Sequence, residues 1–207
     1  MRIVCIFAER KNTLHDMLNI VLFGAPGCGK GTQAARLKEK YGINHISTGE
    51  IIRNEIKNET ELGKQVSAAI QRGELAPDEV VINIIANYVR ENQDCAGNIF
   101  DGFPRTTFQA ERFDEILAEF GLKVDMMIYM DVPEQELVNR ILLRGKESGR
   151  ADDASEDVIR NRIETYRAQT AIVADYYSAQ GKYFDIDGLG TMDEVFDRIC
   201  SVIDAAK

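Results

Sequence analysis

The amino-acid sequence predicts an α/β fold built on a parallel sheet with crossover helices. Short apolar runs of strand length alternate along the chain with amphipathic segments of helical length. Several of these runs are almost continuously apolar, as expected of strands that helices cover on both faces. The first run is followed at once by a glycine-rich turn and a helical pattern.

Five apolar runs are the predicted strands. They are Ile20 to Phe23, Ile43 to Ile46, Ile99 to Phe103, Met126 to Val132 and Tyr183 to Ile186. Start signals mark the helices between them, because Pro77 and Pro133 each precede an amphipathic stretch. Residues 47–76 are predicted to form helical pieces with no strand between them, and the small polar residues 145–154 are predicted to form a mobile loop.

Composition narrows the class of protein. The chain has 207 residues, with 25 Lys and Arg against 34 Asp and Glu, which gives a net charge of −9. This length favours one domain, and the acidic balance disfavours a general binder of nucleic acids or anionic membranes. No apolar stretch is long enough for a membrane helix or a signal peptide. The four scattered cysteines predict neither a zinc ribbon nor a disulfide framework, so we expect a cytoplasmic protein.

Residues 24–32 carry the pattern of a phosphate-binding loop, Gly-Ala-Pro-Gly-Cys-Gly-Lys-Gly-Thr. Glycines let several backbone N–H groups point at one anion, and the following helix N-terminus favours negative charge. Lys30 can bridge the outer phosphates. The competing interpretation is an ordinary glycine-rich turn, which the lysine and the preceding strand disfavour. Gly31 stands where a Ser or Thr would ligate magnesium, so the metal is expected to be held by phosphates and water.

Six arginines are concentrated near the C-terminal third of the chain. They are Arg140, Arg144, Arg150, Arg160, Arg162 and Arg167. At about 100° per residue, the apolar stripe of the helix after residue 155 includes Ile159, Ile163 and Tyr166. Arg162 falls at the edge of that stripe, whereas Arg160 and Arg167 fall further out. Arg162 is therefore the expected inward-facing cation. A salt-bridged surface is the favoured interpretation for Arg160 and Arg167. For the other four arginines, a salt-bridged surface and a phosphate clamp are competing interpretations.

A carboxylate and an arginine follow the third apolar run, in Phe100-Asp-Gly-Phe-Pro-Arg105. The carboxyl ends of parallel strands line the ligand crevice in open α/β sheets. Asp101 there can order magnesium-bound water, and Arg105 can hold a second phosphate group. The alternative is an Asp that caps the next turn.

Several motifs in this order resemble the adenylate kinase family. They are residues 24–33, His45 to Glu50 with Arg53, Asp101 to Arg105 with Gln109, and Ser148 to Asp153 with Arg162. The resemblance runs from about Met17 to the C-terminus. It implies a P-loop nucleoside monophosphate kinase fold, with a five-stranded parallel sheet flanked by helices, a helical lobe for the monophosphate and a short lid.

The resemblance also implies a division of the chain. The core would comprise 17–46, 77–144 and 155–207, the monophosphate-binding lobe 47–76 and the short lid 145–154. Residues 1–16 form an extension outside the match, for which we favour a mis-assigned start codon. The short lid lacks the cysteines of a structural zinc site.

The matching positions imply two nucleotide sites and a set of catalytic residues. Those on the ATP side are Gly27, Cys28, Gly29, Lys30, Gly31, Thr32, Arg140, Arg144 and Gly190. Those on the AMP side are Thr48, Arg53, Glu74, Leu75, Ala76, Gly102, Phe103, Pro104, Arg105, Gln109, Arg150 and Arg162. The catalytic set is Lys30, Asp101, Arg105, Arg144, Arg150 and Arg162.

The implied activity is reversible phosphoryl transfer from Mg²⁺-bound ATP to AMP, giving two ADP. A monomer with small-molecule substrates, and with no nucleic-acid or membrane partner, is expected. One alternative is a UMP/CMP kinase of the same family, although Thr48 and Gln109 favour AMP. Alternatives of another class are a P-loop switch and a non-catalytic nucleotide sensor. The absence of an N-K-x-D string disfavours the switch, and the full arginine set disfavours the sensor.

Overall fold

A five-stranded parallel sheet with the order β2-β3-β1-β4-β5 forms the centre of the fold. The computed structural model describes residues 17–148, 153 and 155–206. The strands are β1 (Leu18–Phe23), β2 (Asn44–Ser47), β3 (Gly97–Asp101), β4 (Met126–Asp131) and β5 (Tyr183–Asp187). All five predicted strands are therefore present, and the parallel α/β class is confirmed.

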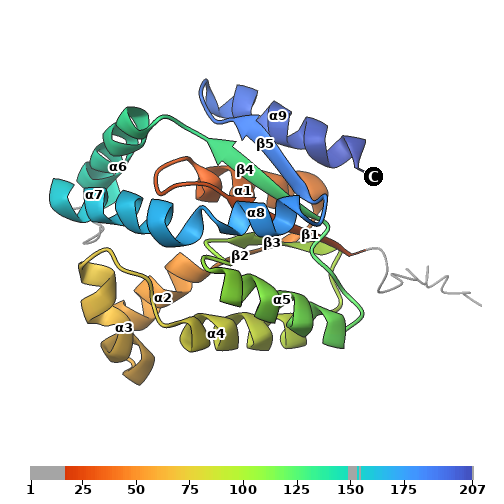
Figure 1. The fold of residues 1–207 in the computed structure, drawn as a ribbon, viewed down its shortest axis with the longest axis horizontal. Helices are drawn as coiled ribbons and strands as arrows, with labels where there is room; N and C mark the ends of the chain where they lie inside the picture. The colour runs from red at the N-terminus through yellow and green to blue at the C-terminus, as the bar shows by residue number, and fades with distance from the viewer. Residues whose placement is uncertain (1–16, 149–152, 154, 207) are drawn as a thin grey trace, which may run out of the picture.

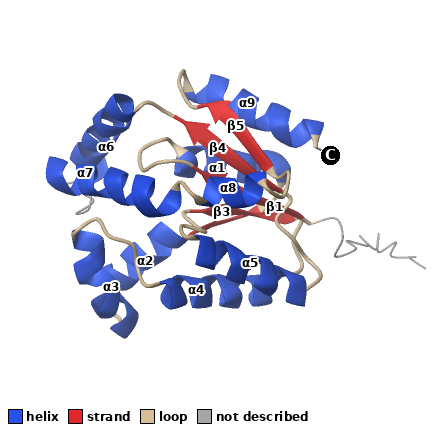
Figure 2. Ribbon diagram, viewed as in Figure 1, coloured by secondary structure: helices blue, strands red, loops and turns tan. Residues whose placement is uncertain are grey.

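Helices cover both faces of the sheet (Figures 1 and 2). Helices α1 (Lys30–Tyr41), α6 (Glu134–Ser148) and α9 (Met192–Ala205) pack with one face. Helices α4 (Asp78–Glu91), α5 (Thr107–Glu119) and α8 (Val173–Ser178) pack with the other. In β1, Ile20 and Leu22 belong to the first layer, while Val21 and Phe23 belong to the second. Because successive side chains of a strand point to opposite faces, this strand needs apolar side chains on both faces, as it has from Ile20 to Phe23.

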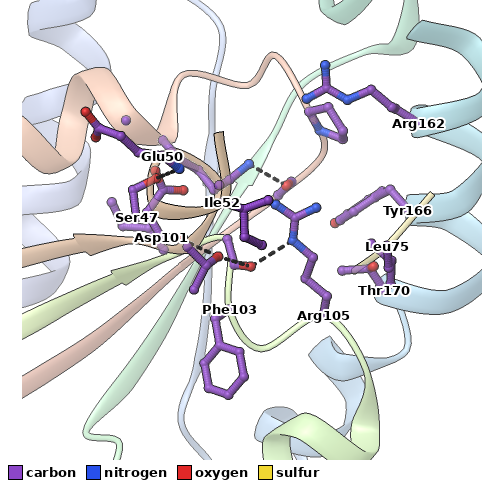
Figure 3. Close-up of a pocket in the computed structure, with 18 of the residues that line it drawn as sticks. Ser47, Glu50, Ile52, Leu75, Asp101, Phe103, Arg105, Arg162, Tyr166 and Thr170 are labelled. Atoms are coloured by element: carbon purple, nitrogen blue, oxygen red, sulfur yellow. Dashed lines mark hydrogen bonds between the residues drawn. The ribbon is translucent and has the colours of Figure 1, made fainter. Parts of the chain in front are cut away.

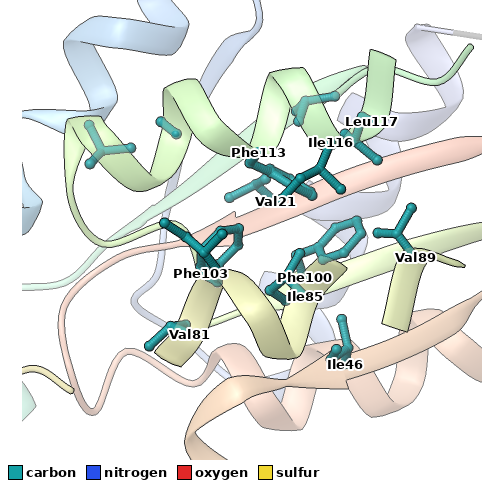
Figure 4. Close-up of a cluster of buried hydrophobic side chains, with 14 of the residues drawn as sticks. Val21, Ile46, Val81, Ile85, Val89, Phe100, Phe103, Phe113, Ile116 and Leu117 are labelled. Carbon is teal, nitrogen blue, oxygen red and sulfur yellow. The ribbon is translucent and has the colours of Figure 1, made fainter. Parts of the chain in front are cut away.

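Three phenylalanines pack together in the layer that contains α4, α5 and α8 (Figure 4). The Phe113 ring of α5 lies edge-on to Phe100 at 4.6 Å and to Phe103 at 5.1 Å between centroids. All three side chains are buried. The prediction that Phe103 ends a strand is wrong. Strand β3 ends at Asp101, and the chain leaves the sheet at Gly102, which has φ +80°. The Phe103 ring fixes the position of the loop after β3.

Two helical regions lie beyond the carboxyl end of the sheet (Figure 1). One contains α2 (Thr48–Lys57) and α3 (Glu61–Gln71), which confirms the predicted helical pieces. Ser47 caps α2 by accepting from the Glu50 N–H, and Thr60 caps α3 by accepting from the Gly63 N–H. The other contains the end of α6 and α7 (Glu156–Thr165), which continues into a π-helical turn at Tyr166–Thr170.

The loop predicted at 145–154 is helical in its first part. Helix α6 continues to Ser148, so the prediction is wrong for the first four residues of that segment. Of the remainder only Asp153 belongs to the described residues, and the extension at 1–16 also lies outside them. No helix of the described part has the length and apolar character that crossing a bilayer requires.

Candidate active site

A cavity of about 540 Å³ lies at the carboxyl ends of β1, β2 and β3. This is the edge at which open α/β sheets bind ligands. Among the described residues, five Lys and Arg side chains line it: Lys30, Arg53, Arg105, Arg144 and Arg162. They come from the start of α1, α2, the loop after β3, α6 and α7. In Figure 3, Arg105 and Arg162 reach toward the cavity from different elements.

The glycine-rich loop joins β1 to α1 in a conformation that requires glycine. Gly27 has φ +89°, and a Cβ there would lie 2.7 Å from Ile141 Cγ1. Lys30 folds back over the loop, and its Nζ donates to the carbonyl oxygens of Gly24 at 2.7 Å and Ala25 at 3.1 Å. Helix α1 has no side-chain cap at its N-terminus. Its first N–H groups are therefore suited to bind an anion.

Cys28 lies beneath this loop. Its side chain is buried, with Sγ 3.5 Å from Lys30 Nζ, and it is absent from the cavity lining. Gly31 and Thr32, by contrast, are exposed at the start of α1 and line the cavity.

Asp101 ends β3 beside Lys30 and His45. Its Oδ2 lies 3.7 Å from His45 Nε2. Burial by itself would raise the pKa of Asp101, but His45, Lys30 and Arg105 outweigh burial and hold this pKa below its usual value. Asp101 is therefore an ionised carboxylate within the cavity. His45 was not predicted as its neighbour; it lies within β2, the strand that pairs with β3.

The loop after β3 gathers three residues predicted to contact a monophosphate. The Gly102 carbonyl oxygen accepts from Thr48 Oγ1 at 2.9 Å and from Arg105 Nε at 2.7 Å. Gln109 follows at the start of α5, where its Oε1 accepts from the Arg105 backbone N–H at 2.7 Å. Glu74, Leu75, Ala76, Phe103 and Pro104, also predicted for this side, line the same cavity.

Arg144 and Arg162 are held together by one carboxylate. Asp153 Oδ2 and Oδ1 accept from Arg144 Nε at 2.7 Å and Arg144 Nη2 at 2.9 Å. Oδ1 also accepts from Arg162 Nη1. The Asp153 side chain is fully buried. Burial would raise the pKa of Asp153, but the two arginines hold this pKa below its usual value. Asp153 was not predicted as a site residue.

The orientation of α7 agrees with the predicted stripe. Ile159, Ile163 and Tyr166 are buried, and the Arg162 side chain is only 17 % exposed. Arg160 and Arg167 are 59 % and 60 % exposed and pair with glutamates at the surface. The prediction that Arg162 faces inward, and the other two outward, is confirmed. The π-helical turn also brings Tyr166 and Thr170 to the cavity, which the sequence did not indicate.

Of the other predicted site residues, two do not line this cavity and one lies outside the described residues. Arg140 and Gly190 do not line it. Arg140 instead donates to the Gly188 carbonyl oxygen at 3.3 Å and pairs with Glu136, close to the loop that contains Gly190. Arg150 lies outside the described residues. No three His, Cys, Asp or Glu side chains of the described part are grouped to hold a metal ion.

One protein family and several named proteins are similar to this chain, and all of them have the same name. The family described as adenylate kinase matches residues 22–182. A protein named adenylate kinase from Bacteroides thetaiotaomicron is 54 % identical over 188 residues, covering 91 % of this chain and 99 % of the relative. Adenylate kinases of Bacteroides fragilis and Parabacteroides distasonis are 53 % and 47 % identical. They cover 91 % and 92 % of this chain, and 99 % and 100 % of their own lengths.

Proposed function

Because the chain belongs to the adenylate kinase family, we propose that its cationic cavity aligns two nucleotides for phosphoryl transfer. The reaction is ATP + AMP ⇌ 2 ADP, and the relatives do not favour the UMP/CMP kinase alternative. The observation that carries the proposed site is the meeting of Lys30, Arg105 and Arg162 in one cavity. The net charge of −9 is a sum over the whole chain, and it does not exclude a cavity lined by lysine and arginine side chains.

The donor ATP is assigned to the glycine-rich loop. The uncapped N-terminus of α1 supports this assignment, since free N–H groups and the helix dipole both favour phosphate. Lys30 would exchange its bonds to the Gly24 and Ala25 carbonyl oxygens for bonds to the outer phosphates. The donor base is assigned to the surface between Arg140 and the loop around Gly190. The contact of Arg140 with the Gly188 carbonyl oxygen supports that placement.

The acceptor AMP is assigned to the space between α2, α4 and the loop after β3. Arg53 and Arg105 are the cations for its phosphate, and both line this part of the cavity. Gln109 is the group assigned to read the base, since a Gln amide can donate to the adenine N1 and accept from the adenine amino group. Thr48 and residues 74–76 would close the sides of this site.

Transfer needs no general base. The attacking phosphate oxygen of AMP is already ionised near neutral pH, so alignment and charge neutralisation are the tasks of the protein. Arg144 and Arg162 are assigned to the transferring phosphoryl group, with Arg150 completing the set. Their common partner Asp153 supports this grouping, because it fixes both guanidinium groups on one point.

Magnesium is assigned to the donor as Mg²⁺-bound ATP. Gly31 offers no ligating side chain, while the ionised Asp101 carboxylate lies close to the same turn. A Cβ on Gly31 would lie 3.6 Å from Asp101 Oδ2, so this carboxylate lies next to the start of α1. This arrangement fits a carboxylate that accepts hydrogen bonds from metal-bound water. The protein is further proposed to act as a monomer on small molecules, without a nucleic-acid partner.

The direct test is the formation of ADP from purified protein. ATP and Mg²⁺ are mixed with AMP, and a second reaction contains ATP and Mg²⁺ alone. We expect two ADP for each ATP consumed with AMP, and only slow hydrolysis without it, because a closed site excludes water. Equal ADP formation in both reactions would instead indicate an ATPase, and no ADP in either would indicate a nucleotide sensor.

A further inference from the structure

Gln109 is held by two partners of opposite hydrogen-bonding character. Its Oε1 accepts from the Arg105 backbone N–H at 2.7 Å, and its Nε2 donates to Asp78 Oδ1 at 2.7 Å. Gln109 is only 1 % exposed, yet it lines the cavity. Asp78 does not line the cavity and lies behind the amide. We infer that Asp78 is a positioning residue that determines which purine the acceptor site selects.

The two partners fix the direction of the amide. A backbone N–H can only donate, and an ionised carboxylate can only accept. A flipped Gln109 would place its Nε2 against the Arg105 N–H and its Oε1 against the Asp78 carboxylate. Both contacts would then be repulsive, around an amide whose residue is only 1 % exposed. Only one of the two amide orientations is therefore compatible with this surrounding.

The free part of the amide then has a fixed pattern. A Gln amide carries two N–H donors and two acceptor lone pairs, so one donor and one lone pair of Gln109 remain for a ligand. Adenine presents an acceptor at N1 and a donor at its amino group. Hypoxanthine has the same ring shape with the pattern reversed, since N1 carries hydrogen and C6 carries oxygen. A Gln109 amide fixed in this orientation can form both hydrogen bonds with adenine. Hypoxanthine would instead place donor against donor and acceptor against acceptor.

Asp78 is itself held in place. It lies in the first turn of α4, and its Oδ1 also accepts from Thr106 Oγ1 at 3.3 Å. Thr106 caps α5 by accepting from the Gln109 N–H at 3.1 Å. The start of α4 is thereby joined to the start of α5 through the side chain behind Gln109. The carboxylate cannot turn away from the amide without losing the Thr106 bond as well.

The test compares AMP with inosine monophosphate as acceptors, by the ratio of their kcat/KM values. This inference rests on the proposed contact of Gln109 with the acceptor base. The unmodified protein should favour AMP by roughly 10- to 100-fold, the usual discrimination of a bidentate base contact. Asp78→Asn should reduce this ratio about tenfold, mainly by raising the KM for AMP, because an Asn can donate to a flipped amide. Asp78→Glu, which remains an acceptor, should restore most of the ratio.

Glu79→Gln is the matched control, because it removes the same charge at the next position of α4, where the side chain is exposed. It should leave the ratio unchanged. A purely structural role of Asp78 would lower the melting temperature without changing the ratio, and that result would overturn the inference. The Gln109→Leu variant tests the contact with the base separately from the role of Asp78. If it removes the preference while Asp78→Asn does not, the base contact stands and the role of Asp78 is wrong. If Gln109→Leu keeps the preference, both are wrong.

Discussion

Arg144 and Asp153 lie nine residues apart and form a two-bond ion pair across the end of α6. The same carboxylate binds Arg162 of α7, so one buried acid sets the distance between two cations of the cavity. Like charges brought together repel one another, and an ionised acid between them offsets that repulsion. The pair is therefore the structural basis of the proposed phosphoryl site.

We predict that Asp153→Asn lowers kcat by about 10- to 100-fold, because misplaced arginines lose the alignment on which transfer depends. The KM values for ATP and AMP should change less. Asp157→Asn is the control, since that side chain is exposed in the first turn of α7. Steady-state kinetics of both variants test this prediction, and a kcat for Asp153→Asn within twofold of the unmodified protein would contradict it.

The same pair predicts a dependence of stability on pH. The folded-state pKa of Asp153 is lower than the unfolded value of about 3.9. Its contribution to stability is therefore fully present above the unfolded value, and is lost as pH falls through the folded value. Urea unfolding of the unmodified protein and Asp153→Asn should differ most near neutral pH and converge in acid. A difference that grew below pH 4 would be evidence against an ionised Asp153.

Loss of the Lys30 ammonium should impair turnover without unfolding the protein. We expect Lys30→Met to lower kcat by on the order of 10²–10³, the usual cost of removing one group that stabilises the transition state. Arg105→Ala should have a similar effect. Lys38→Met is the control on the exposed face of α1. Circular dichroism together with the kinetics separates loss of activity from loss of fold, and near-normal turnover in a folded Lys30→Met protein would exclude the assigned role.

The aromatic contact beneath the site should dominate local stability. Phe113 is fully buried between Phe100 and Phe103. Phe113→Ala should lower the free energy of unfolding by about 3–5 kcal/mol, through lost burial and the cavity left behind. Phe108→Ala on the same helix removes a side chain that is 45 % exposed, and should cost far less. Equal losses in the two variants, measured by urea unfolding, would show that this cluster has no special role.

The strands and the inward face of α7 could be predicted because local patterns determine them. Continuous apolar runs indicate strands covered on both faces, and a 3.6-residue period places Arg162 beside Ile159 and Ile163. The end of β3 was misplaced because Phe103 is as apolar as Phe100. Only the backbone at Gly102, with its positive φ, shows that the chain turns there.

The partners of the site residues could not be predicted because they arise from tertiary contacts. Asp153 contacts arginines nine residues away on either side, and His45 contacts Asp101 of another strand. No helix or strand period reveals these neighbours. Only Pro77 was interpreted as a helix start signal, and the bond of the neighbouring Asp78 to Gln109 links residues 31 positions apart. The cationic set itself was predictable, since the resemblance supplied each position. The carboxylates that orient these cations could be identified only from the three-dimensional structure.

The most direct test of AMP as the acceptor is a competition between monophosphates. ATP, Mg²⁺ and equal concentrations of AMP, CMP and UMP are mixed with the protein, and the loss of each monophosphate is followed over time, because ATP releases ADP whichever acceptor is used. An adenylate kinase whose Gln109 reads adenine should consume AMP well before CMP or UMP. Faster loss of CMP or UMP than of AMP would contradict the assignment of AMP as the acceptor.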